Sequence, residues 1–263
     1  MRYAGSRRLL ALVAVLALPG AALADDVHVM ISAGFFHVYS ELGPAFAKAS
    51  GHHLITTRGP SLGDSPEAIP ARLSRGEPAD VVIMDGHGAD ILDKKGLTRA
   101  DSRIPLGQSF IGMVVRAGQP KPDISTVEAL RKTLLAAKSI AYSDSSSGTY
   151  LSTVGFKKLG VADEVAGKSR KVRGPPTGEP VAAVVARGEA EIGFQQVPEL
   201  INVPGADFVS RVPAEIQPPT YFVGVLTKTA QQPEAAVALL RFLSSQDAAP
   251  VITKAGLTPV AKP

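Results

Sequence analysis

The stretch DVHVMISAGFFHVYSELGPAFAKASGHHLITTRG (residues 26–59) contains the pattern that decides the fold. Residues 26–32 are rich in β-branched side chains and alternate in polarity, which predicts a strand. Residues 39–50 place apolar side chains on one helical face and end before Gly51, a residue type that commonly follows the last helical turn. Residues 52–59 predict a second strand. A strand, a helix and a strand in succession indicate a βαβ unit.

The alternation of strands and helices continues along the chain and predicts two α/β units built around mainly parallel sheets. Ser125 is expected to cap a helix at residues 124–138, with Glu128 completing a capping box. Residues 233–256 are expected to form two helices broken at Pro250. Further strands are expected at residues 79–84, 109–118, 139–144, 191–196 and 221–227, and further helices at 65–77, 89–97, 146–160 and 178–190.

The C-terminal helical segment has no sheet of its own, so it is expected to pack on the first unit. The chain would then pass between the two units twice, near residues 103–110 and 215–222. The predicted first lobe is therefore 25–106 plus 221–263, and the predicted second lobe is 107–220. Two lobes joined in this way leave a cleft between them, which is the usual place for a ligand.

The N-terminus has the three parts of a secretory signal peptide. Three arginines precede an apolar run over residues 9–18, and small residues up to Ala24 predict cleavage there, so that residues 1–24 form the signal peptide. The apolar run is shorter than the roughly 20 residues of a membrane-spanning helix. We therefore expect a protein of the bacterial periplasm without stable membrane insertion.

The composition excludes several classes of protein. Removing residues 1–24 takes away three arginines and no acid, so the net charge falls from +4 to +1, and nucleic acid is not an expected partner. The absence of cysteine excludes disulfides, thiol nucleophiles and thiolate metal sites. The histidines lack the spacing of a zinc motif, and we expect neither a metal nor another cofactor.

A string of hydroxyl side chains, YSDSSSGTYLS (residues 142–152), leads from a predicted strand into a predicted helix. Ser145, Ser146 or Ser147 is expected to cap that helix, and the free N–H groups of its first turn form a site for an anion together with the hydroxyls and Thr149. The alternative is one capping serine with solvated neighbours.

The loop RGPSLGDSP (residues 58–66) also leads from a predicted strand into a predicted helix, but in the first lobe. Ser61 and Ser65 are expected to face the ligand bound by the hydroxyl string. Arg58 is expected either to bind a carboxylate through two N–H groups or to form an ion pair within its lobe. Asp64 is expected either in the cleft or as the N-cap of the next helix.

Other candidates lie at the remaining strand ends. In SAGFF (residues 32–36), Ser32 and Gly34 are expected at the cleft, because a glycine lets a backbone N–H face the ligand. Gln195 and Gln196 end a strand, and the alternation of side chains predicts that only one of them faces the ligand.

With these motifs the chain resembles the periplasmic solute-binding proteins of ABC importers, in the branch of the molybdate-binding protein. This resemblance implies a two-lobed periplasmic-binding-protein (Venus-flytrap) α/β fold with the ligand cleft between the lobes, a small anionic ligand and, for a receptor, an ABC permease as partner. The loops SAGFF and RGPSLGDSP and the pair Gln195-Gln196 depart from the molybdate branch. The similar stretches are ELGPAFAKASGHHL, RGEPADVVIMD, ILDKKGL, GQSFIGMVVRAG, VVARGEAEIGFQQ and PEAAVALLRFLSSQDAAPVITKAGL.

Within this family the chain is most similar to the periplasmic aconitate isomerases. This similarity implies an enzyme that interconverts trans- and cis-aconitate, a tricarboxylate, by an allylic proton shift without a cofactor. The alternative is a receptor for molybdate-like oxyanions or small organic carboxylates. The stretches that carry the similarity are PSLGDSPEAIPARLSRGEPADVV, GQSFIGMVVRAGQPKPDIS, YSDSSSGTYLS and GEPVAAVVARGEAEIGFQQ.

Such an isomerisation needs a base over a methylene group and donors that stabilise the developing negative charge. Asp64 is the expected base, because burial in a cleft raises the pKa of a carboxyl. Tyr150 is expected to donate to a carboxylate of the substrate or to return the proton. The other candidates for proton transfer are Asp85, Asp144, Glu179 and His37.

Overall fold

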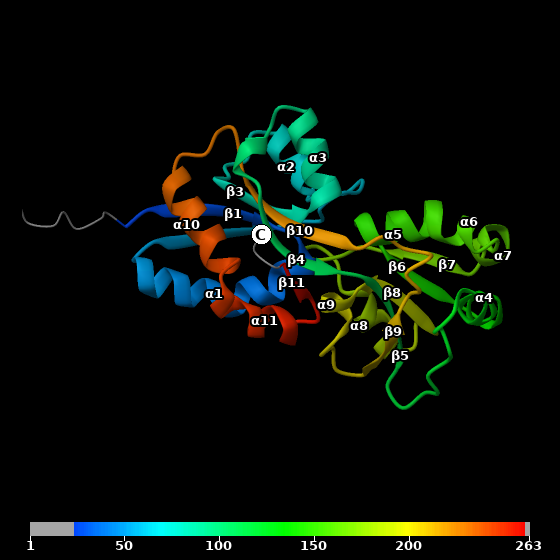
Figure 1. Cartoon of the computed structure of the whole chain (residues 1–263). Coiled ribbons are helices and arrows are strands. Elements are labelled where there is room, and N and C mark those ends of the chain that lie inside the picture. The colour runs from blue at the N-terminus through cyan, green and yellow to red at the C-terminus, as the bar shows by residue number, and fades with distance from the viewer. Residues whose placement is uncertain (1–23, 261–263) are drawn as a thin grey trace, which may run out of the picture.

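The computed structural model describes residues 24–260, which fold into two lobes, each built on one β-sheet (Figure 1). The first lobe contains β1 (Asp26–Ile31), β2 (His53–Arg58), β3 (Val81–Asp85), β4 (Ile104–Ser109), β10 (Thr220–Leu226) and β11 (Thr258–Pro259), with α1 (Ala33–Ser50), α2 (Ile69–Ser74), α3 (Gly86–Lys94), α10 (Pro233–Leu243) and α11 (Ala249–Lys254). The second lobe contains β5 (Ile111–Arg116), β6 (Ile140–Ser143), β7 (Ser169–Val172), β8 (Ile192–Gln196) and β9 (Ala206–Arg211), with α4 (Val127–Ala136), α5 (Ser146–Tyr150), α6 (Phe156–Lys158), α7 (Ala162–Ala166), α8 (Val181–Ala186) and α9 (Val197–Leu200). A π-helical turn (Leu151–Gly155) joins α5 to α6, and short 3₁₀ turns lie at Ala100–Ser102 and Gln246–Ala248.

Both sheets are mixed, so the prediction of mainly parallel sheets is wrong. The strand order is β11-β4-β10-β3-β1-β2 in the first sheet and β7-β6-β8-β5-β9 in the second. Strand β1 is parallel to β2 and β3, and β6 is parallel to β7 and β8. Every antiparallel pair contains β4, β5 or β10, which adjoin the crossings between the lobes. The crossings therefore set the direction of the strands that the βαβ pattern did not predict.

The chain passes from the first sheet to the second at Phe110 and returns through residues 212–219. Gln217, which is 2% exposed, ties these two crossings together. Its Oε1 accepts the backbone N–H of Ile111 at 2.5 Å, and its Nε2 donates to the carbonyls of Ile111 at 2.9 Å and Val212 at 2.7 Å. One buried side-chain amide thus forms hydrogen bonds with backbone groups of both segments that connect the lobes.

The C-terminal helices pack on the first lobe, as predicted. Ile31 of β1 and Phe35 of α1 are buried in the same apolar core as Leu239 and Leu240 of α10. In Figure 1, α10 and α11 lie beside α1 on one side of the sheet. The segment also supplies β11, which pairs with β4 at the edge of the first sheet. The first lobe is therefore built from both ends of the chain.

Two local predictions are wrong. The N-cap of α4 is Thr126 rather than Ser125, because the Thr126 hydroxyl accepts the N–H of Ala129 at 3.1 Å. The break in the C-terminal segment falls after Leu243 rather than at Pro250. Pro250 lies in the first turn of α11, where the N–H that proline lacks would have no intrahelical partner.

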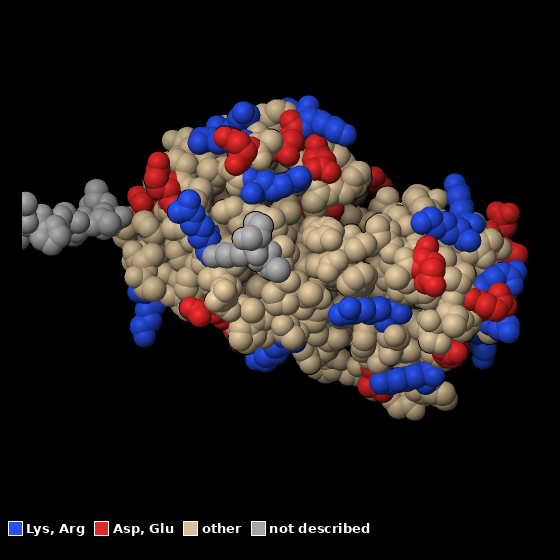
Figure 2. Space-filling view, in the orientation of Figure 1, with Lys and Arg blue, Asp and Glu red and all other residues tan. Residues whose placement is uncertain are grey.

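No helix within residues 24–260 is long and apolar enough to cross a membrane. On the face shown in Figure 2, lysines and arginines are interspersed with aspartates and glutamates. Residues 1–23 of the predicted signal peptide lie outside the described part of the chain.

Replacing Gln217 tests the tie between the crossings. The substitution Gln217→Met keeps the length of the side chain but removes the amide, which leaves buried backbone groups of Ile111 and Val212 without these partners. We expect the free energy of unfolding, measured by urea denaturation, to fall by about 2–4 kcal/mol. Gln246→Met on an exposed residue is the matched control and should change it by less than about 0.5 kcal/mol. Equal losses in the two variants would contradict the role of Gln217.

Candidate functional site

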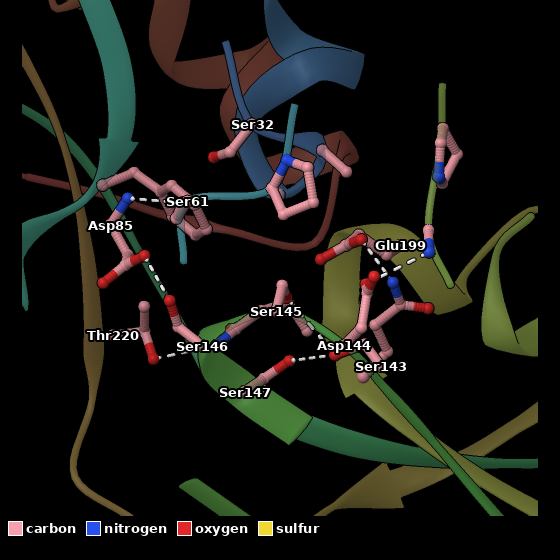
Figure 3. Close-up of a pocket in the computed structure, with 18 residues that line it drawn as sticks. Ser32, Ser61, Asp85, Ser143, Asp144, Ser145, Ser146, Ser147, Glu199 and Thr220 are labelled. Carbon is pink, nitrogen blue, oxygen red and sulfur yellow. Dashed lines mark hydrogen bonds between the residues drawn. The ribbon is translucent and has the colours of Figure 1, made fainter. Parts of the chain in front are cut away.

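A cavity lies between the two lobes and is lined by loops and strand ends of both (Figure 3). Its empty space is about 460 Å³, the solvent-facing mouth included. The first lobe contributes the start of α1, the loop after β2, the end of β3 and part of β10, and the second contributes the segments that follow β6, β7 and β8. The lining residues are Ser32, Ala33, Gly34, Pro60, Ser61, Asp85, Ser143, Asp144, Ser145, Ser146, Ser147, Gly174, Pro175, Gln195, Gln196, Glu199, Thr220 and Phe222.

On the first-lobe wall, Ser32 presents a hydroxyl at the N-terminus of α1. The residue is 3% exposed, and its Oγ has no hydrogen-bond partner within residues 24–260. Helix α1 is 18 residues long, and the N–H groups of its first turn lack intrahelical partners and lie at the positive end of the helix dipole. This hydroxyl and these N–H groups together suit a carboxylate or another oxyanion.

Asp85 connects the two walls. One carboxylate oxygen caps α3 by accepting the N–H of Gly88 at 3.0 Å, and the other accepts the hydroxyl of Ser146 from the second lobe at 2.7 Å. The backbone N–H of Asp85 donates to Ser61 Oγ at 3.2 Å. Both carboxylate oxygens therefore have structural partners, and Asp85 helps to hold the lobes together.

The hydroxyl string forms the second-lobe wall, opposite Ser32 in Figure 3. Ser143 Oγ lies 3.0 Å from Ser147 Oγ and 3.3 Å from Ser145 Oγ, and it accepts the N–H of Gly148 at 3.2 Å. Gly148 has no room for a side chain, because a Cβ would lie 1.8 Å from the carbonyl oxygen of Ser143. Ser145 is the N-cap of α5, but its hydroxyl makes no capping bond. The hydroxyls are thus fixed as one connected group.

Gln195 and Gln196 both line the cavity, so the prediction that only one of them faces it is wrong. They are the last residues of β8, and Gln196 is the N-cap of α9, so the alternation of the strand ends there. Gln196 donates from Nε2 to Thr220 Oγ1 of the first sheet at 2.9 Å. Its Oε1 is buried and has no hydrogen-bond partner in the described part of the chain.

Glu199, in the first turn of α9, brings a carboxyl of unusual proton affinity to the cavity wall (Figure 3). Burial raises the pKa of Glu199 to about 8. The hydrogen bond from Gln195 Nε2, at 2.5 Å, and the positive charge of Arg58 lower this pKa, whereas the charge of Asp144 raises it. A carboxyl that titrates near neutral pH can both accept and return a proton.

The structure brings together eight of the residues predicted to bind the ligand. They are Ser32, Gly34, Ser61, Ser145, Ser146, Ser147, Gln195 and Gln196. Of the alternative proton-transfer residues, Asp85 and Asp144 also line the cavity. Glu179 instead pairs with Arg187 at 2.5 Å, and His37 is exposed on α1.

Asp64 and Tyr150 are not brought into the cavity. The Asp64 side chain is 93% exposed and pairs with Lys171 of the second lobe at 3.2 Å. The Tyr150 hydroxyl donates to the carbonyl of Ile216 at 2.9 Å. The loop of Asp64 nevertheless touches the second lobe, because Gly63 has a φ of 126° and a Cβ there would lie 2.4 Å from the carbonyl oxygen of Asp144.

Ser65, Thr149 and Arg58 also lie outside the cavity lining. The Ser65 hydroxyl donates to the Glu67 carboxylate, and Thr149 is exposed on α5. The Arg58 guanidinium stacks over the ring of Phe36, with 3.8 Å from Cζ to the ring centroid.

Glu199 and Thr220 line the cavity but were not predicted from the sequence. Glu199 follows Gln196 by three residues in QQVPEL, and the available signal was an acid directly after a strand that ends at the cleft. Thr220 had no signal, because the position of β10 follows only from the pairing of the first sheet. Within residues 24–260, no three His, Cys, Asp or Glu side chains are grouped to hold a metal ion.

Comparisons with known proteins agree with the resemblance that the sequence motifs indicated. A family model described as bacterial extracellular solute-binding protein matches residues 27–258. An aconitate isomerase from Pseudomonas sp. is 49% identical over 232 residues, which are 88% of this chain and 87% of that protein. A molybdate-binding protein from Rhodobacter capsulatus is 28% identical over 255 residues, covering 94% of this chain and 93% of the relative.

Among solved structures, the periplasmic molybdate-binding protein from Azotobacter vinelandii has a TM-score of 0.70 at 22% identity, covering 90% of this chain and 100% of that chain. This likeness confirms the predicted two-lobed α/β fold.

The raised pKa of Glu199 gives a pH-dependent stability. The pKa of Glu199 is about 8 in the folded protein and 4.5 ordinarily, so the unfolded chain releases this proton at a lower pH than the folded protein does. The folded state therefore loses stability as the pH rises from about 4.5 to about 8. Glu199→Gln removes that loss, and we expect its gain in Tm over the parent protein to be larger at pH 8 than at pH 5. Glu215→Gln on an exposed residue is the control and should show no such difference. A gain that is the same at both pH values would contradict the buried carboxyl.

Proposed function

Because the chain belongs to the bacterial extracellular solute-binding proteins, we propose that its interlobe cavity holds a small tricarboxylate and that it interconverts trans- and cis-aconitate. The observation that carries this proposal is the Glu199 carboxyl, whose pKa is raised to about 8 at the wall of a cavity that also presents the hydroxyl donors of Ser32 and Ser145. The activity of the Pseudomonas relative supports the same reaction.

The donors on the two walls are suited to bind carboxylates. Ser32 and the first turn of α1 take one carboxylate, and Ser145 and Ser147 with the first turn of α5 take another. No lysine or arginine lines the cavity within the described residues. Neutral donors hold the carboxylates while leaving the charge that develops on the substrate to be stabilised by hydrogen bonds.

Proton transfer then proceeds through Glu199. Its ionised carboxylate takes a proton from the methylene carbon of trans-aconitate, and the electron pair of that C–H bond spreads over the three-carbon allylic unit into a flanking carboxylate. The protonated Glu199 returns the proton to the carbon at the other end of the unit. One C–H bond breaks, another forms, and the double bond moves with no net change in atoms. A base whose pKa lies near the working pH suits this transfer.

A receptor for an ABC importer is the second candidate, with a molybdate-like oxyanion or a small organic carboxylate as ligand and a permease as partner. The unpartnered Ser32 hydroxyl at the start of α1 favours it, since this donor set suits any oxyanion. Glu199 opposes it, because a receptor that only binds an anion has no use for a carboxyl that titrates near neutral pH in its cavity. For either candidate we place the protein in the periplasm, supported by the predicted signal peptide and the extracellular family.

The activity test uses the mature protein mixed with trans-aconitate, with cis-aconitate followed by proton NMR. We expect turnover, and we expect Glu199→Gln to lower kcat/KM by roughly 10²- to 10⁴-fold, the usual contribution of a general base. Glu215→Gln should retain full activity. No turnover, together with a large thermal shift on adding molybdate or tungstate, would instead support the receptor.

The same reaction should depend on pH through Glu199. Only the ionised carboxylate can take the proton, so kcat/KM is expected to rise with pH through a midpoint of about 8 and then level off. A profile that is flat between pH 6 and pH 9 would exclude Glu199 as the base.

Asp64 provides a separate test of the base. Its side chain is 93% exposed, so Asp64→Asn is expected to keep kcat/KM within about twofold, the size of a surface ion-pair effect. A loss as large as that of Glu199→Gln would assign proton transfer to Asp64 in a different arrangement of the lobes.

A further inference from the structure

Gln195, near the end of β8, has both polar ends of its side chain bound by the protein. The residue is 2% exposed and lines the cavity. Its Oε1 accepts the backbone N–H of Val181 at 3.0 Å, and its Nε2 donates to Glu199 Oε2 at 2.5 Å. One buried amide therefore links the first residue of α8 to the proposed base on α9.

The hydrogen bond from Val181 fixes which way this amide points. Val181 begins α8, so its N–H has no partner within the helix, and Gln195 Oε1 supplies one. Rotating the amide by 180° would place Nε2 against this N–H, a donor against a donor. It would also place Oε1 against the Glu199 carboxylate, an acceptor against an acceptor. Gln195 is therefore held as a donor to Glu199.

The hydrogen bond from Gln195 makes the two oxygens of the Glu199 carboxyl unequal. It occupies Oε2, and within residues 24–260 this carboxyl accepts no other hydrogen bond. A proton taken up by Glu199 is therefore carried on Oε1, the oxygen that Gln195 leaves free. Burial raises the pKa of Glu199, and the bond from Gln195 is the largest of the influences that lower it. The same bond thus orients the carboxyl and favours its ionised form.

We propose that Gln195 is a positioning residue for proton transfer, which holds one oxygen of the Glu199 carboxyl and so presents the other to the substrate. This inference rests on the proposed function of Glu199. The next residue, Gln196, bonds instead to Thr220 of the first sheet, so the two neighbouring glutamines have different roles.

The charge of Arg58 lowers the pKa of Glu199 and the charge of Asp144 raises it, but neither residue is hydrogen-bonded to this carboxyl within the described part of the chain. The titratable residues on the elements packed against α9 do not contribute to its pKa. They are His37, Tyr39, Glu41 and Lys48 of α1, Arg116 of β5, and Asp207 and Arg211 of β9. A neutral substitution of Gln195 leaves all these charges in place, so its effect reports the hydrogen bond.

The first experiment measures kcat and KM of Gln195→Met against pH. Methionine keeps the length of the side chain but cannot donate to Glu199. At pH 7 we expect kcat/KM to fall at least about tenfold, the size of one lost hydrogen bond to a charged group. Its rise with pH should move above 8, and KM should change less than kcat, because other residues hold the substrate carboxylates. Gln119→Met on an exposed residue is the control and should leave both constants unchanged. An unshifted profile in Gln195→Met, or a loss confined to KM, would overturn the inference.

A matched pair at Val181 tests the fixed orientation of the amide. Val181→Pro removes the N–H that holds Gln195 Oε1, at the first helical position, where proline is tolerated. Val181→Ala keeps this N–H while also shortening the side chain. We expect a lower kcat and a shifted pH profile in the proline variant, and the parent profile in the alanine variant. The same profile in both variants would overturn the fixed orientation on which the inference rests.

A direct titration separates this inference from the proposed function. The carboxyl carbon of Glu199 is followed by ¹³C NMR without substrate, its signal being assigned by its absence in Glu199→Gln. In Gln195→Met we expect a midpoint higher by about one pH unit, which corresponds to one lost hydrogen bond to a charged group. A raised midpoint without aconitate turnover would support the hold of Gln195 on Glu199 and overturn the proposed reaction. Turnover with an unchanged midpoint would overturn the role of Gln195 alone.

Discussion

Gln217 makes the hydrogen bonds on which the relation between the lobes depends. Its buried amide bonds to Ile111 at the start of β5 and to Val212 just after β9, so one side chain joins the outgoing and the returning crossing. Because the cavity takes residues from both sheets, its walls can be aligned only if these crossings are fixed. The contacts across the cavity, such as Ser146 to Asp85, then add to an arrangement that the crossings already restrict.

The cavity combines two kinds of group that serve different ends. The connected hydroxyls of Ser143, Ser145 and Ser147 are already oriented before a ligand arrives, and preorganised neutral donors suit an anion whether it is carried or converted. Glu199 differs from these hydroxyls, because burial makes its ionisation costly and raises its pKa to about 8. Such a carboxyl is useful in the cavity if it accepts and returns a proton. Glu199, rather than the hydroxyls, therefore distinguishes the isomerase from the receptor.

Much of the fold could be predicted from the sequence, because βαβ units have local signals. These are the composition of the strands and a glycine after the last helical turn, such as Gly51. The antiparallel direction of β5 and β10 could not be predicted, because it depends on pairing between residues distant in sequence. The same holds for the site. Serines in YSDSSSGTYLS follow a strand and were found by position, whereas the burial of Glu199 depends on both lobes. Asp64 was predicted as the base from its place in a loop at the expected cleft. Loop composition cannot show that its carboxylate instead faces solvent.

The position of β10 has a consequence for how the molecule is assembled. This strand lies between β3 and β4, yet it consists of residues 220–226, while all five strands of the second sheet come from residues 111–211. During synthesis, all strands of the second sheet are therefore present before β10, a central strand of the first sheet, has been made. Strands β3 and β4 are left with unpaired edges until the C-terminal residues emerge. The lobe that is synthesised first is the one that must be completed last.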